Sequence, residues 1–396
     1  MLKRDVVVAG VGMTPFSKPS AGATYLEMAP AAARAALDDA GVEYGAIQQA
    51  YAGYVYGDST SGQNVLYELG LTGIPIVNVN NNCSTGSTAL WLASQAIGSG
   101  AADCVLAIGF EQMRPGALSN VWDDRPSPAQ RAEDVASRHP DADPAAPMAA
   151  QLFGGAGTEH MKRFGTPPET FAAVSVKARR HAASNPYAVF RDPLTLEEVM
   201  GSPHIWGPLT RLQCCPPTSG AAAAVICSEE FARAHGLDAS VRLRAQSLVT
   251  DVNGAFDGDD GRRVVGSDMT AAAAHEVYEA AGIGPEDIPV VELHDCFTTN
   301  EVVTYEALGL TPEGTAEQFV RDGENTYGGR VVTNPSGGLL SKGHPLGATG
   351  LAQCAELVWQ LRGQAGARQV EGARLGLQHN LGLGGACVVS LYEKVS

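Results

Sequence analysis

The chain contains two pairs of segments that repeat each other in the same order, and this repetition constrains its fold more than any other feature. MAPAAARAALDDAG at residues 28–41 corresponds to MTAAAAHEVYEAAG at residues 269–282. CSTGSTAL at residues 83–90 corresponds to HPLGATGL at residues 344–351, at a similar separation. A chance likeness of alanine-rich helices explains one such pair, but two ordered pairs indicate an internal duplication.

Apolar runs alternate with helical patterns in both halves of the chain. Each repeated segment is a predicted helix that leads into a predicted strand, and this alternation predicts an α/β fold with duplicated βαβ halves and a largely parallel sheet. The predicted elements are strands at 5–12, 47–54, 101–109, 290–294 and 374–378, and helices at 24–41, 86–97 and 269–282. We place the boundary between the halves at 238, so that they span residues 1–238 and 239–396.

The segment 114–210 matches neither half of the repeat. It is rich in Pro, Asp and Arg, and we interpret it as an insertion that lies over the ends of the sheet and helps to bind substrate. Its predicted helix carries Lys177, Arg179 and Arg180, which are candidate contacts for a phosphate group. The alternative interpretation of these three residues is an ordinary solvated helix face.

Composition excludes several classes of protein. The 396 residues include 27 Lys and Arg against 43 Asp and Glu, a net charge of −16, which argues against binding of nucleic acid or of anionic lipid. The N-terminus lacks the long apolar core of a signal peptide, and no stretch approaches the roughly 20 apolar residues that span a membrane. The C-terminal EKVS is not a peroxisomal signal. We therefore expect a cytoplasmic protein without a membrane span.

The eight cysteines show no paired CxxC motifs, so a structural zinc site is not expected and no metal is assigned. We expect free thiols in a reducing compartment. Cys83 precedes a predicted helix, where unpaired N–H groups and the helix dipole favour a thiolate. The alternative for this residue is a buried, small apolar side chain. His344 occupies the matching place in the second half, so packing the halves about a pseudo-twofold axis would bring a nucleophile and a base together.

Two further segments carry candidate chemistry. ELHDCFTTNE at residues 292–301 places His294 and Cys296 at the end of a predicted strand, where they face a cleft or form a polar turn. Residues this close in sequence point in different directions, so a shared metal is not favoured. HNLGLGGAC at residues 379–387 is a glycine-rich turn between apolar strands, and its backbone N–H groups are candidates for an oxyanion hole.

At these residues the sequence resembles the thiolase superfamily, and within it the sterol-carrier-protein type. The matching motifs run along essentially the whole chain: NNNCSTGSTAL, EHM, NPY, LQCCP, ELHDCF, NTYGG, NPSGGLLSKGHPLGATGLAQCAELVWQLRG and LQHNLGLGGA. The resemblance implies a thiolase fold, a five-layered α/β/α/β/α sandwich with a loop domain inserted in the first half. It also implies a homodimer.

The resemblance also implies roles for individual residues. Cys83 is similar to the acyl-accepting nucleophile, and His344 to the base that activates it. The C-x-G motif that holds the second catalytic thiol of most thiolases is here Gly382-Leu383-Gly384, so this thiol is missing. In the sterol-carrier type, the equivalents of Cys296 and His294 supply the acid and part of an oxyanion hole. Backbone N–H groups of Cys83 and Gly384 would form a second hole.

The implied reaction is the cleavage of a 3-oxoacyl-CoA, with a branched or steroid side-chain acyl group as one possibility, by coenzyme A. CoA is a substrate, and no cofactor is required. One alternative is a thiolase-like retro-aldolase that acts on 3-hydroxyacyl-CoA with a small OB-fold/zinc-ribbon partner protein; such proteins tend to lack the nucleophile that this chain retains. The other alternative is a non-catalytic lipid-transfer protein, which is disfavoured because no sterol-carrier sequence follows Ser396.

Overall fold

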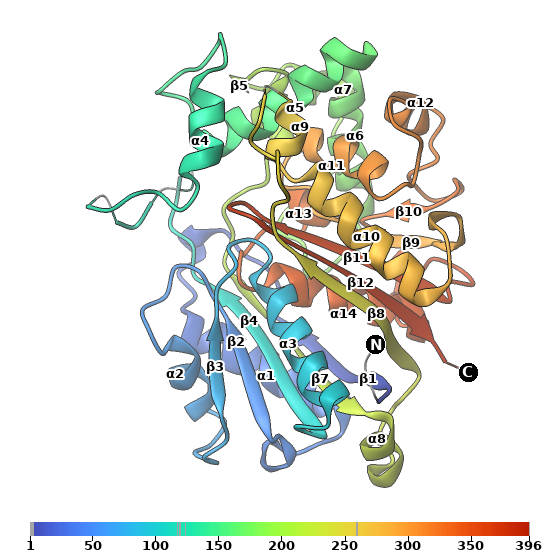
Figure 1. The fold of residues 1–396 in the computed structure, drawn as a ribbon. Coiled ribbons are helices and arrows are strands. Elements are labelled where there is room, and N and C mark those ends of the chain that lie inside the picture. Colours follow the sequence, from blue (N-terminus) through green and yellow to red (C-terminus); the bar gives the residue numbers. More distant parts are fainter. Residues whose placement is uncertain (1–3, 117, 119, 123, 259, 396) are drawn as a thin grey trace.

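A ten-stranded sheet forms the centre of the structure, a computed structural model that describes residues 4–395 except 117, 119, 123 and 259 (Figure 1). The strand order is β10-β9-β11-β12-β8-β1-β7-β4-β2-β3. The strands of the first half are β1 (Val6–Met13), β2 (Gln49–Gly53), β3 (Ile76–Val79), β4 (Cys104–Glu111) and β7 (Gly220–Ser228). Those of the second half are β8 (Val241–Val249), β9 (Val290–Glu292), β10 (Val332–Thr333), β11 (Leu375–Gly382) and β12 (Ala386–Lys394).

The two halves of the sheet have the same topology. In the first half β2 pairs in parallel with β3 and β4, and β7 lies antiparallel between β4 and β1. In the second half β9 pairs in parallel with β10 and β11, and β12 lies antiparallel between β11 and β8. The halves join where Val7 of β1 pairs with Arg242 of β8. The predicted duplication is therefore confirmed.

The expectation of a largely parallel sheet is wrong, because the sheet is mixed. The last strand of each half inserts beside the first strand and runs against both of its neighbours. In the second half a short turn at residues 383–385 connects β11 to β12, and a connection this short joins antiparallel strands only. Apolar periodicity identifies a buried strand but does not give its direction.

Helices divide the structure into five layers. The helix α1 (Tyr25–Ala40) packs on the outer face of the first half-sheet, and α10 (Ser267–Ala281) packs on the outer face of the second. Between the half-sheets lie α3 (Thr85–Ser99) and α14 (Thr349–Arg362), which contact each other and strands of both halves (Figure 1). This arrangement is the predicted α/β/α/β/α sandwich.

The contact between α3 and α14 is made by small residues. A Cβ atom on Gly86 of α3 would lie 2.7 Å from the carbonyl oxygen of Gly347, just before α14. A Cβ on Gly350 would overlap the backbone of Ser87. Because only hydrogen atoms fit at these places, the starts of the two helices approach backbone to backbone. The residues that precede the helices, Cys83 and His344, are brought together as a result.

The part of the insertion between β4 and β7 that the structure describes contains four α-helices and covers the second half of the molecule. Its helices α5 (Met148–Phe164) and α6 (Pro168–Ala182) pack against α11 (Thr298–Ala307), and Phe153 of α5 stacks on Phe297 with ring centroids 5.0 Å apart. Among the described residues, no helix is both long and apolar enough to cross a membrane. The insertion contains α4 (Gln130–Ser137), α5 (Met148–Phe164), α6 (Pro168–Ala182), α7 (Leu196–Met200) and the ladder of β5 (His204–Trp206) with β6 (Leu209–Thr210).

The remaining helices are short and connect the strands of the two halves. They are α2 (Ser61–Tyr67), α8 (Glu229–His235), α9 (Gly261–Val264), α11 (Thr298–Ala307), α12 (Ala316–Arg321) and α13 (Gly338–Ser341). The predicted helix at 24–41 begins and ends as the sequence indicates. Thr24 and Glu27 form a capping box at its start, and Gly41 closes it with a φ of 70°.

Candidate active site

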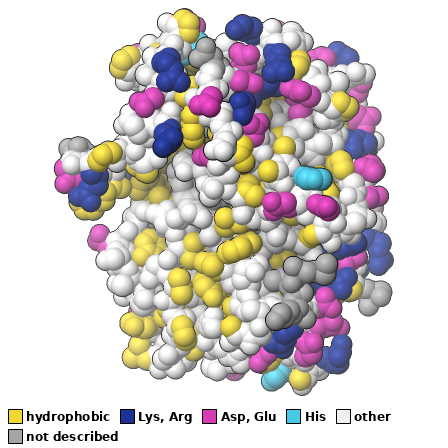
Figure 2. All heavy atoms as spheres, viewed as in Figure 1, with side chains coloured by type: hydrophobic (Ala, Val, Ile, Leu, Met, Phe, Trp, Pro, Cys, Tyr) yellow, Lys and Arg dark blue, Asp and Glu magenta, His cyan; other side chains and the backbone are white. Residues whose placement is uncertain are grey.

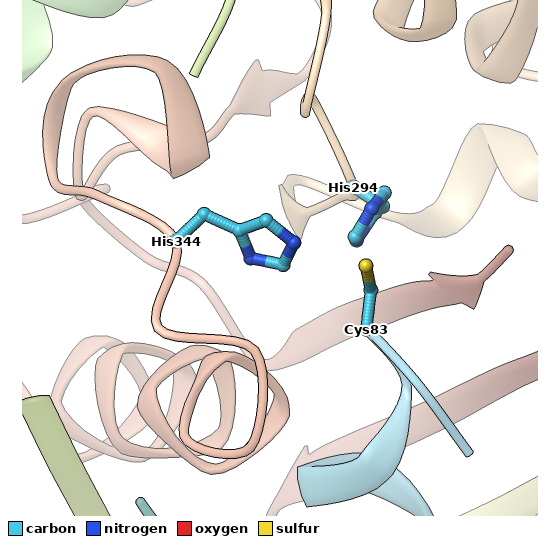
Figure 3. Close-up of side chains that lie close together, drawn as sticks. All are labelled: Cys83, His294 and His344. Atoms are coloured by element: carbon cyan, nitrogen blue, oxygen red, sulfur yellow. The ribbon is translucent and has the colours of Figure 1, made fainter. Parts of the chain in front are cut away.

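Three side chains from different elements meet between the two halves (Figure 3). Cys83 precedes α3, His294 follows β9, and His344 precedes α14. One ligand-type atom of each residue lies within 4.8 Å of the other two, and all three residues are buried. The rings of His294 and His344 are nearly perpendicular, with centroids 5.1 Å apart. The Cys83 sulfur therefore faces two imidazoles.

A hydroxyl fixes the tautomer of His344. Its Nδ1 lies 2.7 Å from Thr349 Oγ1, and that hydroxyl lies 3.0 Å from the carbonyl oxygen of Pro345. Because a carbonyl only accepts, the Thr349 proton goes to Pro345, and His344 Nδ1 donates to Thr349. His344 Nε2 is buried without a hydrogen-bond partner among the described residues, and it keeps its lone pair. In Figure 3 this ring extends toward Cys83 and His294.

A chain of hydrogen bonds fixes the opposite tautomer of His294. Gln378 Nε2 donates to the carbonyl of Gly350 at 2.6 Å and to Ser87 Oγ at 2.8 Å. Ser87 then donates to Asn380 Oδ1 at 2.8 Å. The Asn380 amide group consequently donates to His294 Nδ1, at 3.0 Å. The His294 proton is therefore on Nε2, which makes that nitrogen a hydrogen-bond donor.

Burial determines the charge state of these groups. It raises the pKa of the Cys83 thiol to about 12, although backbone N–H groups of Leu383 and Cys83 act in the opposite direction. It lowers the pKa of His344 to about 3 and that of His294 well below its ordinary value. The thiolate expected at the helix N-terminus stays a prediction, and burial acts against it. With these pKa values the pair is a thiol and a neutral imidazole at neutral pH.

Cys296 lies on the turn between β9 and α11 and is also buried. Burial, followed by the neighbouring Cys215 and Cys83 thiols, raises its pKa well above the ordinary value. Its carbonyl accepts a hydrogen bond from the Cys215 N–H at 2.9 Å, so a third thiol lies beside the site. Cys215 belongs to the LQCCP motif, and nothing in that motif indicates that the residue lies beside Cys296. A thiol that stays protonated can act as a proton donor.

The glycine-rich turn between β11 and β12 lies beside Cys83. Asn82, which has a φ of 51°, donates from Nδ2 to the Leu383 carbonyl at 2.9 Å and so ties this turn to the cysteine. The N–H of Leu383 faces the Cys83 sulfur. The role predicted for the neighbouring Gly384 N–H in an oxyanion hole stays a prediction.

Two cavities open next to the turn between β11 and β12. They measure about 640 and 560 Å³ and share residues 382–385 in their walls. Volumes of this size are typical of small-molecule sites. Arg131 lines the larger cavity and Arg125 the smaller one. On the face of the molecule in Figure 2, basic and acidic side chains are interspersed rather than gathered in one basic patch.

Comparisons with known proteins cover nearly the whole chain. The family described as thiolase, N-terminal domain, matches residues 6–230, and the thiolase C-terminal domain-like family matches residues 261–391. The chain belongs to the thiolase family. Both the predicted family and the predicted fold class are therefore confirmed.

Individual relatives agree with this assignment. Sterol carrier protein 2 of Rattus norvegicus is 54% identical over 98% of this thiolase and 72% of its own length. Benzoylsuccinyl-CoA thiolase subunit BbsB of Thauera aromatica is 38% identical over 97% of this chain and 96% of its own. The solved structure of an Ltp2–ChsH2(DUF35) aldolase has a TM-score of 0.80 over 100% of this chain and 99% of that chain, and its 24% identity supports the fold alone.

One candidate for phosphate binding in this thiolase is wrong. Lys177 is 4% exposed, pairs with Glu301, and donates to Thr333 Oγ1 at 2.6 Å and to the Tyr305 hydroxyl at 3.1 Å. It lies on the face of α6 that packs against α11, so no ligand phosphate reaches it. Three cations on one helix are visible in the sequence, but the face of the helix that each one occupies is not.

The other two cations of this helix are closer to the surface. Arg179 packs over the Phe190 ring at 4.5 Å, and Arg180 donates to Thr326 Oγ1 at 2.8 Å. Neither lines the two cavities that share residues 382–385. Their contact with phosphate stays a prediction.

Sequence reasoning missed several polar residues that form hydrogen bonds around the three side chains. They are Thr349 beside His344, Asn380 beside His294, and Glu111, which accepts a hydrogen bond from the Gly347 N–H. Asn380 lies in the HNLGLGGAC motif, which we consider above only for the backbone N–H groups of its glycine-rich turn. No local pattern marks Glu111, because its partners come from distant segments.

Proposed function

We propose that this thiolase cleaves a 3-oxoacyl-CoA with coenzyme A through an acyl-enzyme on Cys83. The observation that carries the proposal is the buried, unprotonated Nε2 of His344 in the same cluster as the Cys83 sulfur. A base without another partner, beside a thiol, is the arrangement that activates a nucleophile. Family membership supports acyl transfer, and the acyl group is part of the proposal.

In the first half-reaction His344 Nε2 takes the Cys83 proton, and the thiolate attacks the 3-keto carbon. His294 Nε2–H donates a hydrogen bond to one substrate oxygen, and the backbone N–H groups of Cys83 and Gly384 donate to a second substrate oxygen. The bond between C2 and C3 breaks, and its electron pair forms the enolate of acetyl- or propionyl-CoA. Cys296 protonates that enolate at C2, which leaves an acyl thioester on Cys83 and a thiolate on Cys296.

In the second half-reaction the thiol of an incoming CoA attacks the acyl thioester. The Cys296 thiolate accepts the proton of that thiol, and protonated His344 returns its proton to the Cys83 sulfur as it leaves. The products are acetyl- or propionyl-CoA and a shortened acyl-CoA, and every group regains its resting protonation state. Splitting the transfer through a thioester replaces one difficult step by two easier ones.

The hydrogen bonds behind the site support acid–base chemistry over metal binding. By distance alone, Cys83, His294 and His344 could ligate an ion. Asn380, however, donates into His294 Nδ1, and this leaves the proton on Nε2. A metal ligand needs a free lone pair, so this imidazole is suited to donate a hydrogen bond to a developing oxyanion.

The cations that line the cavities replace Lys177 as contacts for CoA. Arg125 and Arg131 lie at the walls of the cavities beside residues 382–385. Because the net charge of −16 repels a polyanion, we propose that the guanidinium groups of Arg125 and Arg131 hold the CoA phosphates. Asp251 and Asp257 also line the larger cavity, however, and Asp124 pairs with Arg125. Arg179 and Arg180 remain candidates for the same role. No redox or metal cofactor is part of the proposed reaction.

The experiment is an assay of CoA-dependent cleavage of 3-oxoacyl-CoA esters with short, branched and steroid side-chain acyl groups. The wild-type protein should release a shortened acyl-CoA and show a mass increase on Cys83 when CoA is withheld. Cys83→Ala should lose both, and Cys387→Ala, which removes a buried thiol of β12, should lose neither. If Cys83→Ala retains the cleavage activity, the proposed mechanism is wrong.

Other parts of the functional hypothesis stay proposals. Aldehyde release from a 3-hydroxyacyl-CoA, dependent on a small OB-fold partner, would favour the retro-aldolase alternative. Binding of lipid without turnover of any CoA ester would favour the lipid-transfer alternative. The homodimer and the cytoplasmic location are likewise predictions, which gel filtration and cell fractionation would test.

A further inference from the structure

Glu111, at the end of β4, is a buried carboxylate that accepts hydrogen bonds from three backbone N–H groups. It is 1% exposed, and among the described residues no cation pairs with it. Its Oε2 accepts from Val55 at 3.0 Å and from Gly347 at 3.1 Å, and its Oε1 accepts from Tyr56 at 2.9 Å. A buried carboxylate is costly, so these three bonds offset its desolvation.

The three N–H groups belong to two segments that enclose Cys83. Val55 and Leu346 pack with Cys83 and Met113 in one apolar cluster. Leu346 and Gly347 lie on the turn that begins at His344 and leads into α14. Glu111 therefore binds one segment from each half of the molecule, on either side of the nucleophile.

The turn at Gly347 packs directly against backbone atoms of β2 and β4. A Cβ atom on Gly109 would overlap the Gly347 carbonyl, and a Cβ on Gly347 would lie 2.7 Å from the carbonyl of Gly53. Contacts of this kind leave no room for a side chain at either glycine. The start of the turn is held by a hydrogen bond from the His344 N–H to Thr218 Oγ1, and its middle by the hydrogen bond from the Gly347 N–H to Glu111. Because His344 is three residues away, a shift of the turn would move its imidazole.

We propose that Glu111 is a positioning residue, whose carboxylate holds the His344 turn and the segment at Val55 in register with Cys83. The inference rests on the proposed function for its effect on turnover, but its effect on Cys83 is independent of any CoA substrate. A displacement of about 1 Å between reacting groups can lower a rate by about 100-fold. The loss should appear in kcat, because none of the three bonds involves substrate.

Two substitutions separate the geometry from the charge. Glu111→Gln removes the charge and places an amide NH₂ opposite one of the backbone N–H groups, so that hydrogen bond is lost. Glu111→Asp keeps the charge, but its side chain is too short to make all three hydrogen bonds at once. The Glu111 charge also raises the pKa of Cys83, behind the larger effect of burial. Among the residues that the structure describes, Tyr56 faces both groups, and burial raises its pKa to about 12, so it stays neutral in the assay. The Cys215 and Cys296 thiols also face Cys83, and burial raises the pKa of each well above its ordinary value.

The experiment measures three quantities on wild type, Glu111→Gln and Glu111→Asp. They are the rate of Cys83 alkylation by iodoacetamide between pH 7 and 10 without substrate, kcat and KM for 3-oxoacyl-CoA cleavage, and the unfolding temperature. Glu356→Gln is the matched control, because this buried carboxylate pairs with Arg368, a residue without contact to the site. It should lower the unfolding temperature and leave Cys83 alkylation unchanged.

We expect kcat to fall about 100-fold in both Glu111 variants, with KM changed by less than about 3-fold. The alkylation curve of Glu111→Gln should move to lower pH, and that of Glu111→Asp should not. If Glu111→Gln keeps the wild-type kcat and the wild-type pH dependence of Cys83 alkylation, the proposal is wrong. If Glu111→Gln does not fold, the kcat of Glu111→Asp tests the proposal, and a wild-type value would contradict it. If the wild type cleaves no 3-oxoacyl-CoA, the alkylation curves still test Glu111.

Discussion

At the scale of single residues, the Thr349 hydroxyl accepts the Nδ1 proton of His344 and leaves Nε2 free to act as the proposed base. We expect His344→Gln to lower the rate of Cys83 acylation by about 10²- to 10⁴-fold, the usual contribution of a positioned base. The rate is measured by intact mass after mixing with a 3-oxoacyl-CoA in the absence of CoA. His181→Gln removes an equally buried imidazole, on α6, and should acylate at the wild-type rate. Equal rates for both variants would contradict the assignment.

The resting charge of Cys83 gives a second prediction for a single residue. Burial raises its pKa to about 12, so the fraction of thiolate increases tenfold per pH unit throughout the neutral range. The rate of iodoacetamide labelling at Cys83, followed by peptide mass mapping, should therefore keep rising beyond pH 9. Cys104 and Cys354 are fully buried and should label only after unfolding. A plateau at Cys83 below pH 8 would show instead that the α3 dipole stabilises a thiolate.

The reactive residues could be predicted from sequence more readily than the residues that orient them. Cys83 and His344 stand at matching places in a repeat, so their local context marks them. Glu111 contacts Gly347, which is 236 positions away in the chain, and no local pattern encodes that contact. Lys177 shows the opposite failure, since a cation on a helix is visible in the sequence but the packed face of that helix is not.

At the scale of elements, the turn before α14 packs backbone to backbone against the first half. Gly347→Ala adds a Cβ that would lie 2.7 Å from the Gly53 carbonyl and would overlap that of Phe110. Since backbone cannot move aside as a flexible side chain can, we expect a loss of at least about 1–3 kcal/mol in the free energy of unfolding. Urea unfolding measures the loss.

Gly45→Ala is the matched control for this substitution. Its Cβ would meet nothing within 4 Å, and its φ does not require glycine. We therefore expect a change between zero and a gain of about 1 kcal/mol, from the smaller entropy of the unfolded chain. Similar losses for both glycines would mean that the slot around Gly347 is looser than its contacts indicate.

The helices and strands themselves could largely be predicted. The expected helix at 24–41 corresponds to α1, and the expected strand at 5–12 to β1, because caps and apolar runs are local signals. The directions of β7 and β12 could not be predicted. They depend on which gap in the sheet each strand fills, and this is a property of the packed halves.

At the scale of the whole molecule, the duplication explains both the fold and the site. Each half-sheet has the same strand order, so the helix that follows Cys83 and the helix that follows His344 occupy equivalent places. When the halves pack with these helices between them, one half contributes the proposed nucleophile and the other the proposed base. The boundary at residue 238 stays a prediction, although β7 ends at Ser228 and β8 begins at Val241.

The interior also makes the stability of the whole molecule depend on pH. Burial lowers the pKa of His181, His344 and His379 to about 3 and that of His294 well below its ordinary value. In the unfolded chain these groups bind protons below about pH 6.5. The unfolded state therefore binds more protons than the folded state below that pH, and this favours unfolding.

Three buried carboxyl groups act in the opposite direction. Burial raises the pKa of Glu111 to about 7 and of Asp295 to about 8, and it also raises that of Glu292. These groups bind protons in the folded state at a pH at which they are ionised in the unfolded chain. They stabilise the folded state as the pH falls toward about 4.

Below about pH 5.5 nearly all four imidazoles are protonated in the unfolded chain and outnumber the three carboxyl groups, so we expect the free energy of unfolding to fall between about pH 5.5 and 4.5. One net proton corresponds to about 1.4 kcal/mol per pH unit. Urea unfolding at a series of pH values measures this slope. His181→Gln removes the one of the four imidazoles that lies on α6, away from Cys83. The free energy of unfolding of this variant should therefore be nearly constant over the same pH range. A wild-type protein that becomes more stable toward pH 4.5 would show that the carboxyl groups dominate.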